Sequence, residues 1–134
     1  REDINFSDTL TASPKVFDLV REMAFLSQEE LWLLILNSQN QCQEIIKLTK
    51  GTIDRSLFDV SLILSNVLRR GVKRFIIVHN HPGGTSLPSR EDNEATDRLM
   101  NSCKTLGLAL LDHLIVYGPR DTDYYSYSDD GKLR

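Results

Sequence analysis

The chain has 134 residues, of which 40% are hydrophobic and 26% are charged, and its formal net charge is −3. A chain of this length can bury an apolar core as one domain without disulfides or a structural metal, and this composition excludes disorder as the main state. The charge balance offers no broad cationic surface for nucleic acid, the apolar runs are too short to span a bilayer, and no secretory signal pattern opens the chain. We therefore expect a soluble, cytoplasmic protein without a membrane partner, folded as a single domain over residues 1–134.

The first part of the sequence predicts a short helix and a hairpin of two strands. Ser13 followed by Pro14 is typical of a helix start, with the serine as N-cap and the proline at the first helical position. Residues 31–36 form a continuous apolar run, which is typical of a strand buried on both faces, and the turn-forming residues 37–40 follow it. We expect residues 42–49 to form the partner strand of the hairpin.

The middle of the chain predicts a helix and then a central strand. Asp54 is a good N-cap, and apolar residues recur at helical spacing after it until Gly71, a natural helix stop. The basic residues between positions 69 and 74 surround the end of this helix, where cations favour the helix dipole. We interpret them as a solvated helix end rather than as a nucleic-acid patch. Residues 75–78 are β-branched and aromatic and predict a central strand.

The last part of the sequence predicts a helix and two further strands. Ser89 begins a helix that runs to about Leu106, with Asp92 in a capping-box position and Gly107 as the terminator. Residues 108–117 predict a strand, and residues 124–127 a short edge strand or ordered tail. The resulting order, α-β-β-α-β-α-β-β, predicts an α/β fold in which a mixed central sheet forms the middle of a three-layer sandwich.

The residues that indicate chemistry follow the predicted central strand. His79 and His81 are one residue apart, seven residues separate His81 from Ser89, and Asp92 follows two residues later. At the end of a strand, side chains two apart can point to the same side, and a carboxylate in the first helical turn can fold back beside them. Two imidazoles and one carboxylate form a catalytic zinc set with one open position for water. The Ser89 hydroxyl would stabilise an oxyanion that develops near the metal.

Each part of this pattern also has a purely structural interpretation. Ser89 and Asp92 alone form an ordinary helix N-terminus, and a single histidine at a strand end is more often a structural hydrogen-bonding group. The joint pattern favours a metal, because two of the three histidines of the chain lie two apart, just before a glycine-containing loop and an acidic helix start.

These residues carry a family resemblance. The segment from His79 to Asp92 resembles the JAMM signature of the JAB/MPN metalloprotease superfamily, and in particular its bacterial RadC branch. Further matches lie around Asn37 and Asn40, at residues 50–52 and at residues 111–116, so the resemblance extends over about residues 13–133. It implies the JAB/MPN fold, similar in architecture to cytidine deaminases, and a hydrolase that uses one zinc ion to cleave peptide or isopeptide bonds of a protein or peptide substrate.

The resemblance also implies a glutamate at the start of the first core strand, which would act as general base and then as general acid. Glu29 and Glu30 both precede the apolar run. The RadC pattern, counted back from Asn37, favours Glu29, and its neighbour would point to the other side of an extended strand. For either residue, a solvated charge ahead of a strand is the alternative.

The sequence departs from the family pattern in three places. RadC proteins generally carry an N-terminal helix-hairpin-helix segment, so this chain is expected either to be a fragment or to lack that module. The loop at residues 82–88 lacks the serine expected near Gly83, and residues 54–59 replace the usual Pro-Arg-Glu run. Since the spacing to Ser89 is intact, we expect the metal site to be unaffected.

Several other residues have a structural interpretation that we favour. We expect His113 to form a structural hydrogen bond or to support a ligand rather than to bind metal itself, with Asp112 as a candidate partner. The tyrosines at positions 124, 125 and 127 could stack on bases but fit an edge strand better. Cys42 and Cys103 lie far apart without a CxxC spacing, so we expect them to be reduced and partly buried.

Two alternatives to the hydrolase remain. One is a non-catalytic interaction domain that acts in DNA transactions, a role suggested only by the family's association with DNA repair. The other is a metal-dependent nuclease, which would prefer an oxygen-rich magnesium site and is disfavoured by two histidine ligands. The adjacent letters His-Asn-His do not indicate an HNH nuclease, whose residues are spread over a ββα unit.

Overall fold

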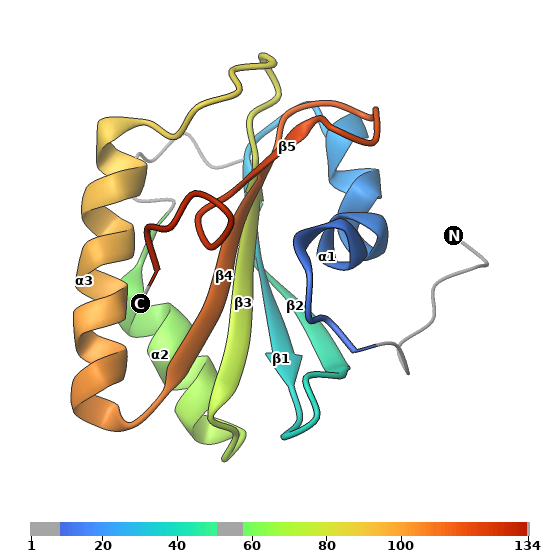
Figure 1. The fold of residues 1–134 in the computed structure, drawn as a ribbon. Helices are drawn as coiled ribbons and strands as arrows, with labels where there is room; N and C mark the ends of the chain where they lie inside the picture. Colours follow the sequence, from blue (N-terminus) through green and yellow to red (C-terminus); the bar gives the residue numbers. More distant parts are fainter. Residues whose placement is uncertain (1–8, 51–57, 134) are drawn as a thin grey trace.

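A five-stranded mixed sheet forms the centre of the computed structural model, which describes residues 9–50 and 58–133 (Figure 1). The strands lie in the order β2-β1-β3-β4-β5; β3 and β4 are parallel, and every other neighbouring pair is antiparallel. In chain order the elements are α1 (Ser13–Val20), the 3₁₀ helix η1 (Arg21–Phe25), β1 (Glu30–Leu36), β2 (Cys42–Lys50), α2 (Val60–Arg69), β3 (Arg74–Asn80), α3 (Arg90–Leu106), β4 (Ala109–Val116) and β5 (Tyr124–Ser126).

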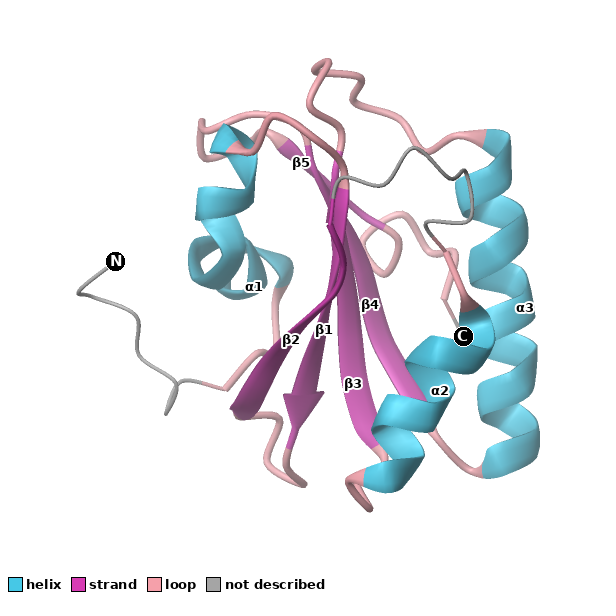
Figure 2. Cartoon of the chain, turned by 180° about the vertical axis from the view of Figure 1, so that it is seen from behind, coloured by secondary structure: helices cyan, strands magenta, loops and turns pink. Residues whose placement is uncertain are grey.

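Helices cover both faces of this sheet. Helices α2 and α3 lie on one face, whereas α1 and η1 lie on the other, as the two opposite views show (Figures 1 and 2). The predicted three-layer α/β sandwich, its element order and the central position of the strand over residues 75–78 are therefore confirmed. Within the described ranges, no helix combines the length and the apolar character needed to cross a membrane.

The apolar run of β1 supplies both halves of the core. Trp32 and Leu34 pack into the cluster on the α1 face, while Leu33 and Ile35 pack into the cluster under α2 and α3, because successive strand residues point to opposite faces. All four side chains are at most 2% exposed. Burial of each such side chain stabilises the fold by roughly 1.5–3 kcal/mol, which is why a strand buried on both faces is apolar throughout.

Two helix starts differ from the sequence prediction. Helix α1 begins at Ser13 itself, with Ala12 as the N-cap residue, and the Ser13 hydroxyl instead bonds Tyr124 and Asp129. Helix α2 begins at Val60, because the Asp59 side chain accepts a hydrogen bond from the Leu62 amide and caps it there. The predicted start at Asp54 was therefore too early; Asp54 itself, with the rest of residues 51–57, lies outside the described residues.

The strand register determines which chain segments meet at the functional end of the sheet. Strands β1 and β3 are antiparallel, with Leu31 opposite His79, so the start of β1 lies beside the end of β3. Helix α3 begins after the loop that follows β3, and Ser89 caps it together with Asp92 in the predicted capping box. The residues before β1, after β3 and at the start of α3 are thereby close in space.

Candidate metal centre

The two histidines at the end of β3 point to the same side, as predicted. The Nε2 atoms of His79 and His81 are 3.2 Å apart. His79 is fully buried, and His81 is half-buried. The shared direction follows from the two-residue repeat of a strand, which places His79 and His81 on the face covered by α2 and α3.

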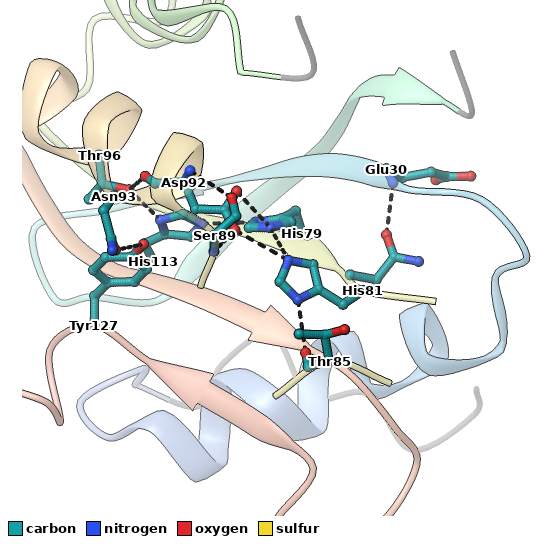
Figure 3. A network of polar contacts seen from close by, with 11 residues as sticks. Glu30, His79, His81, Thr85, Ser89, Asp92, Asn93, Thr96, His113 and Tyr127 are labelled. Carbon is teal, nitrogen blue, oxygen red and sulfur yellow. Dashed lines mark hydrogen bonds and ion pairs between the residues drawn. The ribbon is translucent and has the colours of Figure 1, made fainter. Parts of the chain in front are cut away.

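Asp92 completes the cluster from the first turn of α3 (Figure 3). Its Oδ1 atom lies 3.4 Å from His79 Nε2, and its Oδ2 atom lies 3.2 Å from His81 Nε2. The three ligand atoms all lie within 4.8 Å of one another, so His79, His81 and Asp92 could hold a metal ion. The capping box contributes directly to this geometry, because the Ser89 amide donates to Asp92 Oδ2 at 2.8 Å and holds the carboxylate toward the histidines.

The loop after β3 orients the ring of His81. Gly84 adopts a positive φ of 84° and donates its amide to the His81 carbonyl, which closes a turn that a side chain would strain. The turn brings the Thr85 carbonyl to 2.8 Å from His81 Nδ1 (Figure 3). Because a carbonyl only accepts, His81 carries a proton on Nδ1, and its neutral ring presents the lone pair of Nε2 to the site.

The charges at the site favour an ionised carboxylate beside imidazoles. Burial opposes ionisation of Asp92, but the neighbouring imidazoles of His79 and His81 outweigh it and hold the pKa of the carboxyl well below its ordinary value. The hydrogen bond to Asp92 raises the pKa of His81 against the effect of burial, and the charge of Glu29 adds to this rise. A negatively charged group between two imidazoles is a suitable environment for a cation.

A third histidine lies directly behind His79. His113 Nε2 is 2.9 Å from His79 Nδ1, and His113 Nδ1 is 2.7 Å from the Thr96 hydroxyl (Figure 3). His113 is fully buried, which lowers its pKa well below the ordinary value, and it supports His79 instead of joining the ligand cluster. Asp112 does not bond the His113 ring: its Oδ1 accepts the His113 backbone amide, while the side chain points to the opposite face of the sheet, as neighbouring strand residues must.

The two candidate glutamates have different surroundings. Glu30 points away from the histidines (Figure 3), and its Oε1 accepts the Trp32 indole N–H at 2.9 Å on the face covered by α1. Glu29 is exposed and lies close enough to His81 for its charge to raise the pKa of that ring. Between these two residues, Glu29 is therefore the one whose charge acts at the histidine cluster.

The sequence analysis missed the role of Asn80, the residue between the two histidines. Its buried side chain donates from Nδ2 to the Gln28 carbonyl at 3.0 Å and accepts the Glu30 amide on Oδ1 at 2.7 Å. These two bonds hold the backbone on both sides of Glu29. No signal in the sequence could have identified this contact, because it depends on the register between β1 and β3.

Ser89 lies at the edge of the cluster and has its predicted capping role. Its hydroxyl oxygen accepts the Asp92 amide at 2.9 Å. A hydroxyl that accepts one hydrogen bond still has its own proton, so Ser89 retains a donor for another group.

The remaining sequence predictions concern residues outside the cluster. Tyr124 stacks on Phe17, and Tyr127 stacks on His113, so these rings serve the protein interior at or next to the edge strand β5. Arg70 at the end of α2 pairs with Glu44, which agrees with a helix-end role for the basic residues. Both cysteines are free, and burial raises the pKa of Cys42 and of Cys103 to about 11.

Comparison with known proteins finds a matching family and similar sequences. Residues 10–132 match the family described as a RadC-like JAB domain. The chain is 40% identical over 110 residues to a UPF0758 protein of Streptococcus sanguinis, a match that covers 82% of this chain and 47% of the relative. It is 34% identical over 133 residues to a UPF0758 protein of Thermotoga maritima, with 99% of this chain and 59% of the relative covered. The chain thus spans about half the length of the curated relatives it matches.

Proposed function

Because the chain belongs to the family of RadC-like JAB domains, we propose that it is a zinc-dependent hydrolase of the JAMM type that cleaves peptide or isopeptide amide bonds. The observation that carries this proposal is the convergence of His79, His81 and Asp92. A carboxylate and two ring nitrogens crowd within hydrogen-bonding distance of one another, and a carboxylate has no proton of its own to share. A cation between them satisfies all three groups.

The type of ligand favours zinc. Two imidazoles and one carboxylate are a common set in catalytic zinc sites, whereas magnesium and calcium prefer oxygen ligands throughout. When bound, zinc would lower the pKa of water toward neutrality and polarise a carbonyl oxygen.

Glu29 is the proposed general base and general acid. Its charge acts on His81, and Asn80 holds the backbone on both sides of it. From this position the carboxylate would take a proton from the attacking water and pass it to the leaving amine, which requires a carboxylate one hydrogen bond from that water. Glu30 is unsuited to this role because its carboxylate bonds Trp32 on the other face.

Ser89 is the proposed oxyanion donor. Its oxygen is already an acceptor for the Asp92 amide, so the free hydroxyl proton is available for the negative charge that develops on the substrate carbonyl. The same serine holds the Asp92 carboxylate through its backbone amide, so it would serve both the metal ligand and the substrate.

A matched pair of glutamine variants tests the proposal. We expect the zinc-loaded protein to release primary amines from a denatured protein or from isopeptide-linked peptides, and Glu29→Gln to lower kcat by about 10²–10⁴-fold with unchanged zinc affinity. Glu30→Gln is the control, because its amide oxygen can still accept the Trp32 N–H.

Two outcomes would contradict the proposal. If the wild-type protein hydrolyses no more amide than a chelator-treated sample, the domain is an interaction module rather than an enzyme. If Glu30→Gln loses activity while Glu29→Gln retains it, the assignment of the base is wrong.

A further inference from the structure

The hydrogen bond behind His79 raises a question that distances alone leave open. His79 Nδ1 and His113 Nε2 are 2.9 Å apart, and either ring nitrogen could be the donor. The direction matters because a neutral imidazole carries one proton. If His79 donates from Nδ1, its Nε2 presents a lone pair to the cluster; if it accepts there, a proton on Nε2 blocks that position.

The hydrogen bonds of Thr96 determine which of the two rings, His79 or His113, donates in this contact. Its hydroxyl donates to the Asp92 carbonyl at 2.7 Å, within α3. The same oxygen lies 2.7 Å from His113 Nδ1. A hydroxyl has a single proton, and a carbonyl cannot donate, so the Thr96 oxygen must accept from His113, and His113 carries its proton on Nδ1.

The proton on His113 then determines the proton on His79. His113 is fully buried, and burial favours its neutral form, which leaves Nε2 without a hydrogen. That nitrogen can only accept, so a neutral His79 that keeps this bond donates from Nδ1 and leaves Nε2 without a proton.

Aromatic contacts hold the His113 ring in this orientation. Tyr127 stacks on it with a centroid separation of 4.5 Å and an interplanar angle of 2°, and Phe58 packs edge-on at 5.2 Å. The Tyr127 hydroxyl in turn donates to Asn93 Oδ1 on α3 (Figure 3). A 180° flip of the ring within this plane would place Cδ2 and Cε1 where Nδ1 and Nε2 lie and would break the bonds to Thr96 and His79.

We infer that Thr96 and His113 are positioning residues that set the tautomer of His79 so that its Nε2 is free to bind a metal. The chain of bonds begins and ends at candidate ligands, because Thr96 bonds the backbone of Asp92 and His113 bonds the ring of His79. The inference rests on the proposed function only in that His79 binds the metal.

The first test reads the tautomers directly. In metal-free protein labelled with ¹⁵N-histidine, at a pH above the histidine range, long-range ¹H–¹⁵N spectra distinguish protonated from bare ring nitrogens. We expect His79, His113 and His81 all to carry the proton on Nδ1, the last because of the Thr85 carbonyl. A proton on Nε2 of His79 or of His113 would overturn the inference, and this measurement requires no variant to fold.

The second test removes the hydroxyl that sets the direction. Thr96→Val should move a fraction of His113, and with it His79, to the Nε2–H form and weaken zinc binding by about 10- to 100-fold, measured by competition with a chromophoric chelator. Thr96→Ser retains the hydroxyl and should restore both the spectrum and the affinity. An unchanged spectrum and unchanged affinity in a folded Thr96→Val protein would overturn the inference.

These tests separate the inference from the proposed hydrolase. The spectra and zinc titrations use neither substrate nor turnover, so an inactive wild-type protein would contradict the hydrolase and leave the tautomer result intact. Conversely, a wrong tautomer on His79 would overturn the inference even in a protein that hydrolyses amides.

Discussion

Asp92 and Asp112 are both buried carboxylates, with 8% and 5% of their surface exposed, but they lie in opposite surroundings. Asp92 lies on the α3 side of the sheet and faces two imidazoles. Asp112 lies on the α1 side, where Oδ1 accepts the His113 and Ser128 amides and Oδ2 accepts the Ser126 hydroxyl. Burial by itself therefore does not distinguish a candidate ligand from a structural acid.

The partners of each carboxylate make the distinction. The partners of Asp112 are fixed donors that no metal would replace, and burial raises the pKa of this carboxyl despite them. Asp92 has one such donor, the Ser89 amide, and its other contacts are titratable ring nitrogens that can face a metal instead. A carboxylate whose neighbours are themselves potential ligands indicates a cation site.

The largest expected difference between Asp92 and Asp112 is in their effect on zinc affinity. We expect Asp92→Asn to weaken zinc binding by more than about 100-fold, which exceeds the usual effect of removing a group that only hydrogen-bonds a metal ligand. Asp112→Asn should leave the zinc affinity of the folded protein unchanged. Metal content after purification without added metal or a histidine tag, followed by zinc titration, measures both. Equal losses in the two variants would mean that the cluster of His79, His81 and Asp92 is not the metal site.

The contributions of Asp92 and Asp112 to stability should change with pH in opposite directions. The pKa of Asp92 is lowered, so its contribution is present above 3.8, the ordinary value, and is lost as the pH falls below it. The pKa of Asp112 is raised, so its contribution is fully present below 3.8 and is lost as the pH rises through the raised pKa.

The same asparagine variants measure these contributions in urea titrations of metal-free protein across acid pH. Asp92→Asn should flatten the acid loss of unfolding free energy, whereas Asp112→Asn should steepen it. Asp112→Asn should also lower stability by about 1–3 kcal/mol, because a buried donor loses its acceptor. Parallel curves for both variants would show that the two environments do not differ.

The smallest expected difference between the two sides of the sheet is in the reactivity of their cysteines. Cys42 packs in the cluster on the α1 face and Cys103 in the cluster under α2 and α3. With pKa values of about 11, both thiols are protonated at neutral pH and should react slowly with a disulfide reagent; their contribution to stability is lost as the pH rises from 9.0 through about 11.

Zinc should make the two thiols differ. A metal that links β3 to α3 suppresses local opening of the helix that carries Cys103, so zinc should slow its labelling more than that of Cys42. Single-thiol variants, Cys42→Ala and Cys103→Ala, assign the rates. If zinc slows the labelling of Cys42 as much as or more than that of Cys103, the metal does not bind at α3.

Local patterns predicted most of the fold and the three candidate ligands. The apolar run before Asn37, the capping box at Ser89 and the two-residue spacing of the histidines each act within a few residues, so they can be recognised without knowledge of the rest of the chain. The start of α2 was predicted at Asp54, whereas Asp59, an acid of the same capping type, caps the helix that the structure describes.

Asp112, the candidate partner of His113, bonds its backbone amide and not its ring, for a reason that the sequence already contained. Neighbouring residues of a strand point to opposite faces, so two adjacent side chains in β4 cannot share a site on one face.

The sequence by itself determined the α/β architecture, the order of the elements and the set of His79, His81 and Asp92, since these depend on local spacing and burial periodicity. The tertiary structure decided that Asn80 holds the backbone around Glu29, that Glu30 faces away from the site, and that His113 and Thr96 lie behind His79. These contacts join β1, β3, α3 and β4, whose relative positions follow from strand register and helix packing over the whole domain, and no short segment of sequence specifies them.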